Sequence, residues 1–272
     1  MVEGKTIVLK FGGSAFQPEA LQPFAKRVSA YTGAGHRVVI VHGGGKEINA
    51  MLEALGMKSV FIDGLRVTDE ATLKVVEMVL CGHVNKAIVR SLLANGVRAI
   101  GLSGQDGGML VAKPLVSEKP DAQGRLVRID YGHVGEVDKV HAEPLEVLLR
   151  SHLVPVVAPL GITNQGVSLN CNADTAAAAI AGALKADLFA LLTDVAGVLV
   201  PQNGSKAVAP VLTAADIERL KVDGTVTGGM IPKVDCCLAA LKAGAKGTVI
   251  ASMDNFVAAT DLGGTRIVDV IP

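Results

Sequence analysis

Short apolar runs alternate along this chain with segments in which apolar residues recur at helical spacing. The first two runs are Thr6–Phe11 (TIVLKF) and Arg37–His42 (RVVIVH), and a helical pattern over Pro18–Tyr31 separates them. Similar runs follow as VRAIGL, VPVVAPL, LFALLTD (Leu188–Asp194) and GTVIAS. Strands that alternate with helices in this way are typical of a mainly parallel sheet. The sequence therefore predicts the α/β fold class.

The strongest helical pattern runs from Thr68 to Asn95, with one apolar stripe formed by Leu73, Val76, Leu80 and Val84. Thr68 or Asp69 could cap its start. Further helices are expected at Lys46–Leu55, Ala214–Leu220 and Ile231–Ala243. The polar stretch SEKPDAQGRLVRIDYGHVGE predicts hairpins or a surface excursion, whereas PQNGSKA looks like a turn-rich patch. If the chain forms two lobes, we expect the seam near residue 180.

Composition narrows the function classes. The chain has 272 residues, 50% of them hydrophobic, and 26 basic residues balance 26 acidic ones. This balance and the absence of Trp disfavour a nucleic-acid partner. The longest Ala-rich run is too short for a bilayer, and the N-terminus lacks a signal-peptide pattern, so no membrane partner is expected. Four cysteines without C-x-x-C spacing indicate free, buried thiols and a cytoplasmic location.

Glycines follow both of the first two predicted strands. Gly12 and Gly13 come after the first, and the segment VVIVHGGGKEI places three more after the second. The second segment is not a Walker A loop, because Ile40 and Glu47 stand where a glycine and a Ser or Thr are needed. Ile48 likewise excludes a G-x-G-x-x-G loop. Each glycine cluster alone is best explained as a tight turn, but both together favour an anion site at the carboxyl ends of the strands.

Three charged residues could act with these glycines. Lys10 interrupts an apolar strand, so it either reaches an anion, pairs with a carboxylate or lies on an exposed edge strand. Lys233 lies in the first turn of a helix, against the helix dipole, and is either a surface residue or part of an anion site. Asp174 starts a helix and could be only its cap, or could hold the lysines in position. Together they suggest phosphoryl transfer, which needs positioning and charge neutralisation.

The chain resembles the amino acid kinase family over essentially its whole length. The matching motifs, in order, are LKFGGS, VIVHGGGKEI, GLRVTD, IGLSGQDGG, GHVGEV, LNCNADTAA, LLTDVAGVL and GGMIPKV. GLRVTD and LNCNAD resemble the branch that acts on acetylglutamate rather than on aspartate, carbamate or uridylate. The resemblance implies a three-layer α/β/α sandwich with two lobes, residues 1–180 for the acyl substrate and 181–272 for ATP. It also implies that ATP phosphorylates N-acetyl-L-glutamate to N-acetyl-L-glutamyl 5-phosphate, the second step of arginine biosynthesis.

The resemblance assigns roles to particular residues. Lys10 and Lys233 would stabilise the transition state, and Asp174 would orient both. Phosphoryl and substrate groups would be bound by Gly12, Gly13, Gly44 and Gly45. Arg66 would pair with the substrate α-carboxylate, although a surface salt bridge to Asp63 or Asp69 explains this arginine about equally well. Asn170 would form a hydrogen bond with the same end of the substrate, and its alternative is a residue that forms a turn. The nucleotide would contact Asp194, Gly197, Val198, Leu199, Thr225, Thr227 and Met230.

Magnesium would be held through the ATP phosphates, with few protein ligands. His42 is given no catalytic role, because a carboxylate nucleophile is already ionised at pH 7. Lys46 is interpreted as a solvated residue at the start of a helix. The short segment before the first strand resembles arginine-insensitive, homodimeric members, and inhibition by arginine at physiological levels would overturn that expectation.

Two rival functions remain open. One is a related kinase for carrier-protein-linked aminoadipate, which GLRVTD disfavours and which would need a basic patch for an acidic carrier. The other is a non-catalytic amino-acid sensor on the same fold. A sensor needs no transition-state charge, so the presence of Lys10, Asp174 and Lys233 argues against it.

Overall fold

The computed structural model describes residues 4–12, 18–120, 123–202, 204–258 and 263–269. Within them, a central eight-stranded sheet has the order β16–β18–β17–β13–β1–β2–β10–β5. Its strands are β16 (Val211–Thr213), β18 (Thr265–Val268), β17 (Thr248–Ser252), β13 (Leu188–Thr193), β1 (Thr6–Phe11), β2 (Arg37–His42), β10 (Val154–Ala158) and β5 (Ala99–Ser103). The six strands from β17 to β5 are mutually parallel, and β18 pairs antiparallel with β17. The predicted α/β class with a mainly parallel sheet is confirmed.

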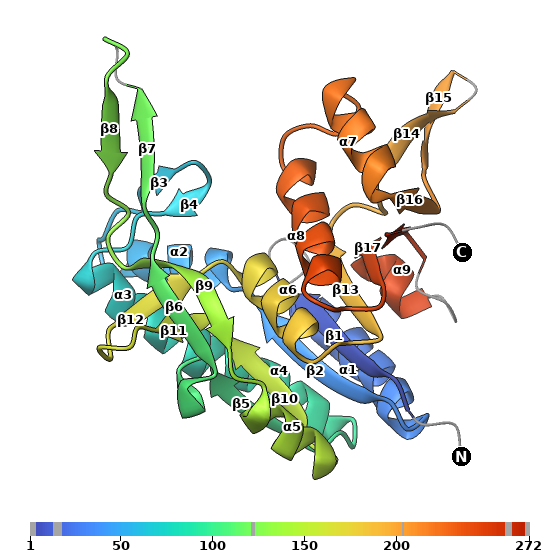
Figure 1. The fold of residues 1–272 in the computed structure, drawn as a ribbon. Coiled ribbons are helices and arrows are strands. Elements are labelled where there is room, and N and C mark those ends of the chain that lie inside the picture. The colour runs from blue at the N-terminus through green and yellow to red at the C-terminus, as the bar shows by residue number, and fades with distance from the viewer. Residues whose placement is uncertain (1–3, 13–17, 121–122, 203, 259–262, 270–272) are drawn as a thin grey trace.

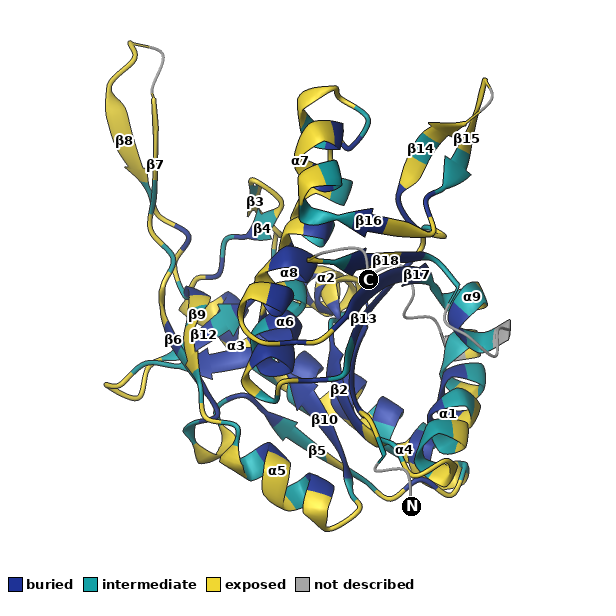
Figure 2. Ribbon diagram, turned by 45° about the vertical axis from the view of Figure 1, so that its right-hand side comes forward, coloured by how far each residue is buried: buried dark blue, intermediate teal, exposed yellow. Residues whose placement is uncertain are grey.

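Helices cover both faces of this sheet (Figure 1). They are α1 (Pro18–Gly33), α2 (Gly45–Ala54), α3 (Glu70–Glu77), η2 (Met78–Val84), α4 (Asn85–Ala94), η3 (Asp106–Gly108), α5 (Glu143–Arg150), α6 (Ala173–Ala183), α7 (Ala214–Val222), α8 (Met230–Lys242) and α9 (Met253–Ala258). Because side chains alternate along a strand, Leu9 and Phe11 of β1 join the core under α1 and α4, whereas Val8 joins the core under α6 and α8. The molecule is thus the expected three-layer sandwich, with the strands as its buried middle layer (Figure 2).

A second, smaller group of strands lies beside the sheet. A four-stranded closed barrel is formed by β6 (Leu110–Pro114), β9 (Val134–Val140), β11 (Leu160–Ile162) and β12 (Ser168–Cys171). Separate hairpins are formed by β3 (Phe61–Ile62) with β4 (Leu65–Arg66), β7 (Ser117–Pro120) with β8 (Leu126–Ile129), and β14 (Leu199–Gln202) with β15 (Ser205–Val208). The hairpin expected in the polar middle segment is therefore present. The segment around PQNGSKA is also a hairpin, since its turn joins two paired strands.

The long helical pattern from Thr68 to Asn95 forms three joined segments, α3, η2 and α4. Asp69 is the residue that caps its start, because its side chain accepts a hydrogen bond from the Thr72 amide. Gly96 follows its end with φ 75°, a conformation that favours glycine. The π-helical η2 was not expected from the apolar stripe. A π-helical segment changes the phase of the stripe, and such segments often occur near functional sites.

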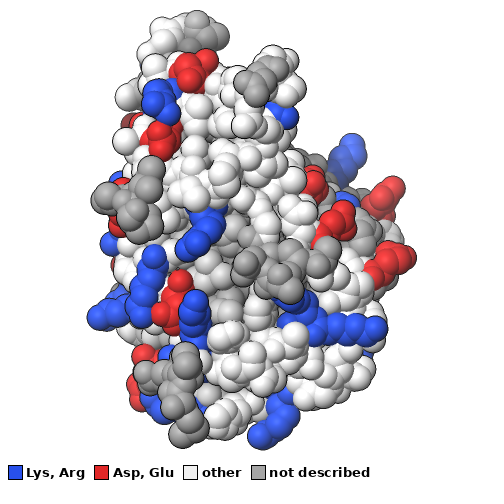
Figure 3. All heavy atoms as spheres, turned by 90° about the vertical axis from the view of Figure 1, so that its right-hand side faces the viewer, with Lys and Arg blue, Asp and Glu red and all other residues white. Residues whose placement is uncertain are grey.

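Basic and acidic residues are balanced in this chain, with 26 of each. Figure 3 shows basic and acidic side chains interspersed over one face of the molecule. The helices in the described ranges include none with the length and apolar character needed to cross a bilayer. All four cysteines are free, and three of them (Cys171, Cys236 and Cys237) are buried, while Cys81 is half-buried.

Candidate active site

The two glycine clusters lie side by side at the carboxyl ends of β1 and β2. The Gly43 amide donates a hydrogen bond to the Phe11 carbonyl at 3.0 Å. Gly12 has φ +153°, and a Cβ on it would lie 2.5 Å from the Gly43 nitrogen, so only glycine fits there. Gly13 lies outside the described residues. The prediction that both loops meet at one edge of the sheet holds for Gly12 and the Gly43–Gly45 segment.

Gly44 is the N-cap of helix α2 and Gly45 its first residue, and both line a cavity of about 200 Å³. A Cβ on Gly44 would lie 2.7 Å from Cδ2 of Leu80, in the π-helical segment η2. Gly45 has open space where a side chain would be. Free amides at the start of a helix favour an anion, so this end of the cavity suits a negatively charged group.

Arg66 projects into the same cavity from strand β4, and only 7% of the residue is exposed to solvent. Its Nη1 donates to Ser59 Oγ at 2.7 Å and its Nη2 to the Gly45 carbonyl at 3.1 Å. The guanidinium also lies 4.7 Å from the centre of the Phe61 ring. Burial lowers the pKa of Arg66, which reflects the cost of holding a charge in this site.

Neither carboxylate considered for Arg66 from the sequence is its partner. Asp63 accepts hydrogen bonds from Lys119 and Tyr131. Asp69 is engaged as the cap of α3. In the described part of the chain, Arg66 forms no ion pair with Asp or Glu, so it is a buried cation that faces the cavity without an anion. A buried cation of this kind is costly unless it binds a negative group.

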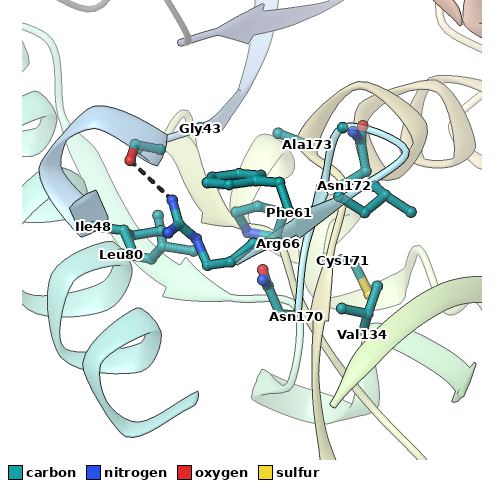
Figure 4. A pocket seen from close by; sticks show the side chains of 15 residues that line it. Gly43, Ile48, Phe61, Arg66, Leu80, Val134, Asn170, Cys171, Asn172 and Ala173 are labelled. Carbon is teal, nitrogen blue, oxygen red and sulfur yellow. Dashed lines mark hydrogen bonds between the residues drawn. The ribbon is translucent and has the colours of Figure 1, made fainter. Parts of the chain in front are cut away.

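Asn170 lies in strand β12 rather than in a turn, and it lines the cavity opposite the glycines. Its Nδ2 donates to Thr68 Oγ1 at 3.2 Å, and that hydroxyl donates to the Arg66 carbonyl at 2.8 Å. Asn170 and Arg66 are therefore linked through one buried threonine, and both amide and guanidinium face the same space (Figure 4).

Lys10 is buried in a central strand, not on an exposed edge. Its Nζ lies 2.8 Å from Oδ1 of Asp174, in the first turn of α6. The cap of α6 is Asn172, whose side chain accepts hydrogen bonds from the amides of Asp174 and Thr175. Because Asn172 satisfies the helix end, Asp174 is not needed as a cap and its carboxylate holds the lysine.

Lys233 lies near this pair but does not bond Asp174. Its Nζ donates to the Gly229 carbonyl at 3.2 Å. The Cys236 thiol lies one turn further along α8, and its pKa is raised to about 12, mainly by burial and then by the charges of Asp174 and Asp235, whereas Lys10 and Lys233 oppose the rise. The charges of all three predicted catalytic residues therefore act on one thiol of α8. Asp174 pairs with Lys10, whereas Lys233 donates to the Gly229 carbonyl, and the roles of the three residues stay predictions.

The residues expected to contact the nucleotide lie beyond β13 and before α8. Asp194 follows β13 and accepts a hydrogen bond from Thr193 Oγ1 at 2.9 Å. Gly197 and the buried Val198 pack against Thr265, and Leu199, the first residue of β14, is half-exposed. Thr225 and Thr227 belong to the loop before Met230, where α8 starts. Their role in nucleotide binding stays a prediction.

Sequence reasoning missed two residues that contact Arg66, namely Phe61, which lines the cavity, and Ser59, which accepts a hydrogen bond from Nη1. Both come to Arg66 because β3 and β4 form a hairpin around Asp63 and Gly64, which have φ 54° and 77°. An Asp-Gly pair is a common signal for such a turn. That signal could have placed Phe61 beside Arg66, because the two are paired across the hairpin.

Comparisons with known proteins agree with this geometry. A family model described as "Amino acid kinase family" matches residues 5–252. A protein of Acidiphilium cryptum named acetylglutamate kinase is 46% identical over 249 residues, which cover 91% of this chain and 82% of that protein. One of the same name from Geobacter metallireducens is 46% identical over 244 residues, covering 89% and 82%. The crystal structure of smu.665 from Streptococcus mutans UA159 has a TM-score of 0.78 at 32% identity, covering 97% of this chain and 99% of that one.

Proposed function

We propose that this chain, which belongs to the amino acid kinase family, transfers the γ-phosphoryl group of ATP to the side-chain carboxylate of N-acetyl-L-glutamate. The observation that carries the proposal is the buried Arg66, which faces a cavity beside two glycine loops and has no anionic partner within the described residues. The relatives named acetylglutamate kinase support the choice of substrate. The products are ADP and N-acetyl-L-glutamyl 5-phosphate, and the step belongs to arginine biosynthesis.

In this proposal the substrate lies in the cavity between Arg66 and the glycines. Arg66 binds the α-carboxylate through its planar guanidinium, and Phe61 and Ser59 hold that guanidinium in place. Asn170 donates to the same end of the substrate. The side-chain carboxylate then points to Gly44 and Gly45, at the start of α2.

The reaction needs positioning and charge neutralisation rather than a base. An ionised carboxylate oxygen attacks the γ-phosphorus, and the bond to the β–γ bridging oxygen breaks with its electron pair leaving on ADP. Lys10 neutralises charge on the transferred group, and the amides of Gly12 and Gly44 donate to its oxygens. Asp174 fixes Lys10 at 2.8 Å. Lys233 is proposed to turn from the Gly229 carbonyl toward the leaving phosphate when ATP is present.

ATP is proposed to bind through the loops around Asp194, Gly197–Leu199 and Thr225–Met230. Magnesium would be held mainly by the nucleotide phosphates, where it would offset their charge. Residues 1–180 and 181–272 are proposed as the acyl-substrate and nucleotide lobes. We also propose that the protein works in the cytoplasm as a homodimer, and sedimentation would test that assembly.

The direct test is ATP-dependent formation of an acyl phosphate, trapped by hydroxylamine. N-acetylglutamate, glutamate, aspartate and N-acetylaminoadipate should be compared side by side. We expect turnover with N-acetylglutamate alone. If folded protein turns over none of the four compounds, the proposed substrate is wrong, and the carrier-linked kinase or the sensor takes its place.

A further inference from the structure

His42, the last residue of β2, is fully buried on the sheet face opposite Lys10. Its Nδ1 lies 2.9 Å from the Gly43 carbonyl oxygen. Its Nε2 lies 3.1 Å from Nδ2 of Asn85, the first residue of α4. The imidazole therefore joins the glycine loop to a helix on the other side of the strand.

The Asn85 amide decides which ring nitrogen carries the proton. Asn85 Nδ2 also donates to the Val156 carbonyl at 2.8 Å, which identifies this atom as the amide nitrogen. Asn85 Oδ1 accepts from Lys86 Nζ at 3.0 Å, which agrees with that orientation. Since Nδ2 can only donate, His42 Nε2 must accept, and the ring proton resides on Nδ1. His42 Nδ1–H then donates to the Gly43 carbonyl.

That donation fixes a peptide plane in the glycine loop. The Gly43 amide is held by the Phe11 carbonyl at 3.0 Å, and its carbonyl is held by His42 at 2.9 Å. In a trans peptide the carbonyl and the next N–H point in opposite directions. Because His42 draws the Gly43 carbonyl toward the α4 face, the Gly44 N–H is turned away from that face and toward the sheet face from which Lys10 projects.

We propose that His42 and Asn85 are positioning residues that aim the Gly44 N–H at the transferred phosphoryl group. The inference rests on the proposed kinase function, because it concerns the direction of a phosphoryl-binding amide. Neither side chain touches substrate, so each acts through the loop. Strand β5, two places from β2 in the sheet, leaves room for the Asn85 side chain, because a Cβ on Gly101 would lie 1.8 Å from Asn85 Oδ1.

A matched pair of variants distinguishes an effect on the direction of the Gly44 N–H from a general effect on the packing around His42. In His42→Asn the amide nitrogen can take the place of Nδ1 and keep the donor to Gly43, but the bond to Asn85 is lost. In His42→Gln the amide oxygen can take the place of Nε2 and accept from Asn85, but the donor to Gly43 is lost. Both remove one buried hydrogen bond, so we expect similar decreases in melting temperature.

The expected difference is in turnover with N-acetylglutamate. His42→Gln should lower kcat by roughly 10- to 100-fold with little change in KM, since a misdirected donor acts mainly on the transition state. His42→Asn should keep kcat within about threefold, because its donor is retained. Equal kcat values for the two folded variants, or wild-type kcat in His42→Gln, would overturn the proposal.

A second readout does not depend on the reaction. Long-range ¹H–¹⁵N spectra of the histidine rings, with the His42 signals identified by their loss in His42→Asn, should show a neutral ring protonated at Nδ1. In ¹⁵N-glycine-labelled protein, the Gly44 amide signal should move in His42→Gln and stay near its wild-type position in His42→Asn. An Nε2-protonated ring, or an unmoved Gly44 signal in His42→Gln, contradicts the proposal even in folded protein without kinase activity. Absence of wild-type turnover alone would instead reject the proposed function.

Discussion

The Nζ of Lys10 lies 2.8 Å from Oδ1 of Asp174, and the two side chains are only 10% and 21% exposed. The lysine comes from the centre of the sheet and the carboxylate from the start of α6, so the pair ties β1 to the helix beside the cavity. We expect Lys10→Met to lower kcat by about 10²-fold or more, with a smaller change in KM, because the charge serves the transition state. Steady-state kinetics with N-acetylglutamate and ATP measure both constants.

Asp174→Asn should lower kcat through Lys10, so its effect should not add to that of Lys10→Met. Residues that act as a unit give strongly non-additive losses. The double variant is therefore expected to resemble Lys10→Met. The matched control is Lys74→Met, which breaks an exposed pair with Glu70 on α3 and should leave kcat unchanged. Additive losses would show that Asp174 acts independently of Lys10.

Arg66 is expected to set the affinity for the acyl substrate. Arg66→Lys keeps a positive charge but cannot bond Ser59, Gly45 and a carboxylate at once. We expect KM for N-acetylglutamate to rise by roughly 10- to 100-fold, the effect of about 1.5–3 kcal/mol for a charged hydrogen bond, with little change in KM for ATP. Arg90→Lys, at an exposed position on α4, is the control. An equal rise for both substrates would place Arg66 elsewhere in the mechanism.

The hairpin that carries Phe61 and Arg66 is held by Asp63. Its carboxylate accepts hydrogen bonds from Lys119 and from Tyr131, the latter at 2.9 Å, and the Lys119 bond is the main reason that the pKa of Asp63 is lowered. Asp63→Asn keeps the left-handed turn, since Asn also tolerates φ near 54°, but removes the charge.

Because the side chains of Asp63 and Lys119 are both exposed, the loss of their ion pair should have only a mild effect on substrate binding. We expect Asp63→Asn to raise KM for N-acetylglutamate by about two- to fivefold through a looser hairpin, with kcat nearly unchanged. The effect should shrink at high salt, which screens the wild-type pair. Asp138→Asn, which removes an exposed partner of Lys113 on the barrel, is the control. A KM that is equal to wild type at low salt would show that the Asp63–Lys119 pair does not hold the hairpin.

The sequence predicted the central strands well because burial on both faces gives them continuous apolar runs. Thr6–Phe11 and Arg37–His42 match the observed strands residue for residue. The barrel was not predicted, since a strand such as Val134–Val140 has three charged residues among its valines and is defined by partners far along the chain.

The same distinction applies to the site. Lys10 and the glycines stand out locally, because each breaks the pattern of its own strand or loop. Ser59 and Phe61 do not, because their roles depend on a hairpin that folds back on Arg66. The π-helical conformation of η2 was also not predicted from the apolar stripe. Leu80 and Val84, which both belong to the predicted stripe, lie against Gly44, and their contact with a distant glycine loop is set by the tertiary fold.

The buried His42 should make stability depend on pH below neutrality. Burial lowers its pKa from the usual 6.5 to about 4, the hydrogen bond to Gly43 opposes this, and the charge of Lys86 adds to it. Between these values the unfolded chain binds more protons than the folded one, so the free energy of unfolding rises with pH. The contribution is complete above pH 6.5 and is lost as the pH falls toward 4, by about 3 kcal/mol in total. Urea unfolding of wild type and His42→Asn from pH 7 to 4.5 measures it. We expect the two stabilities to converge as the pH falls, and a constant difference would mean that His42 does not titrate in this range.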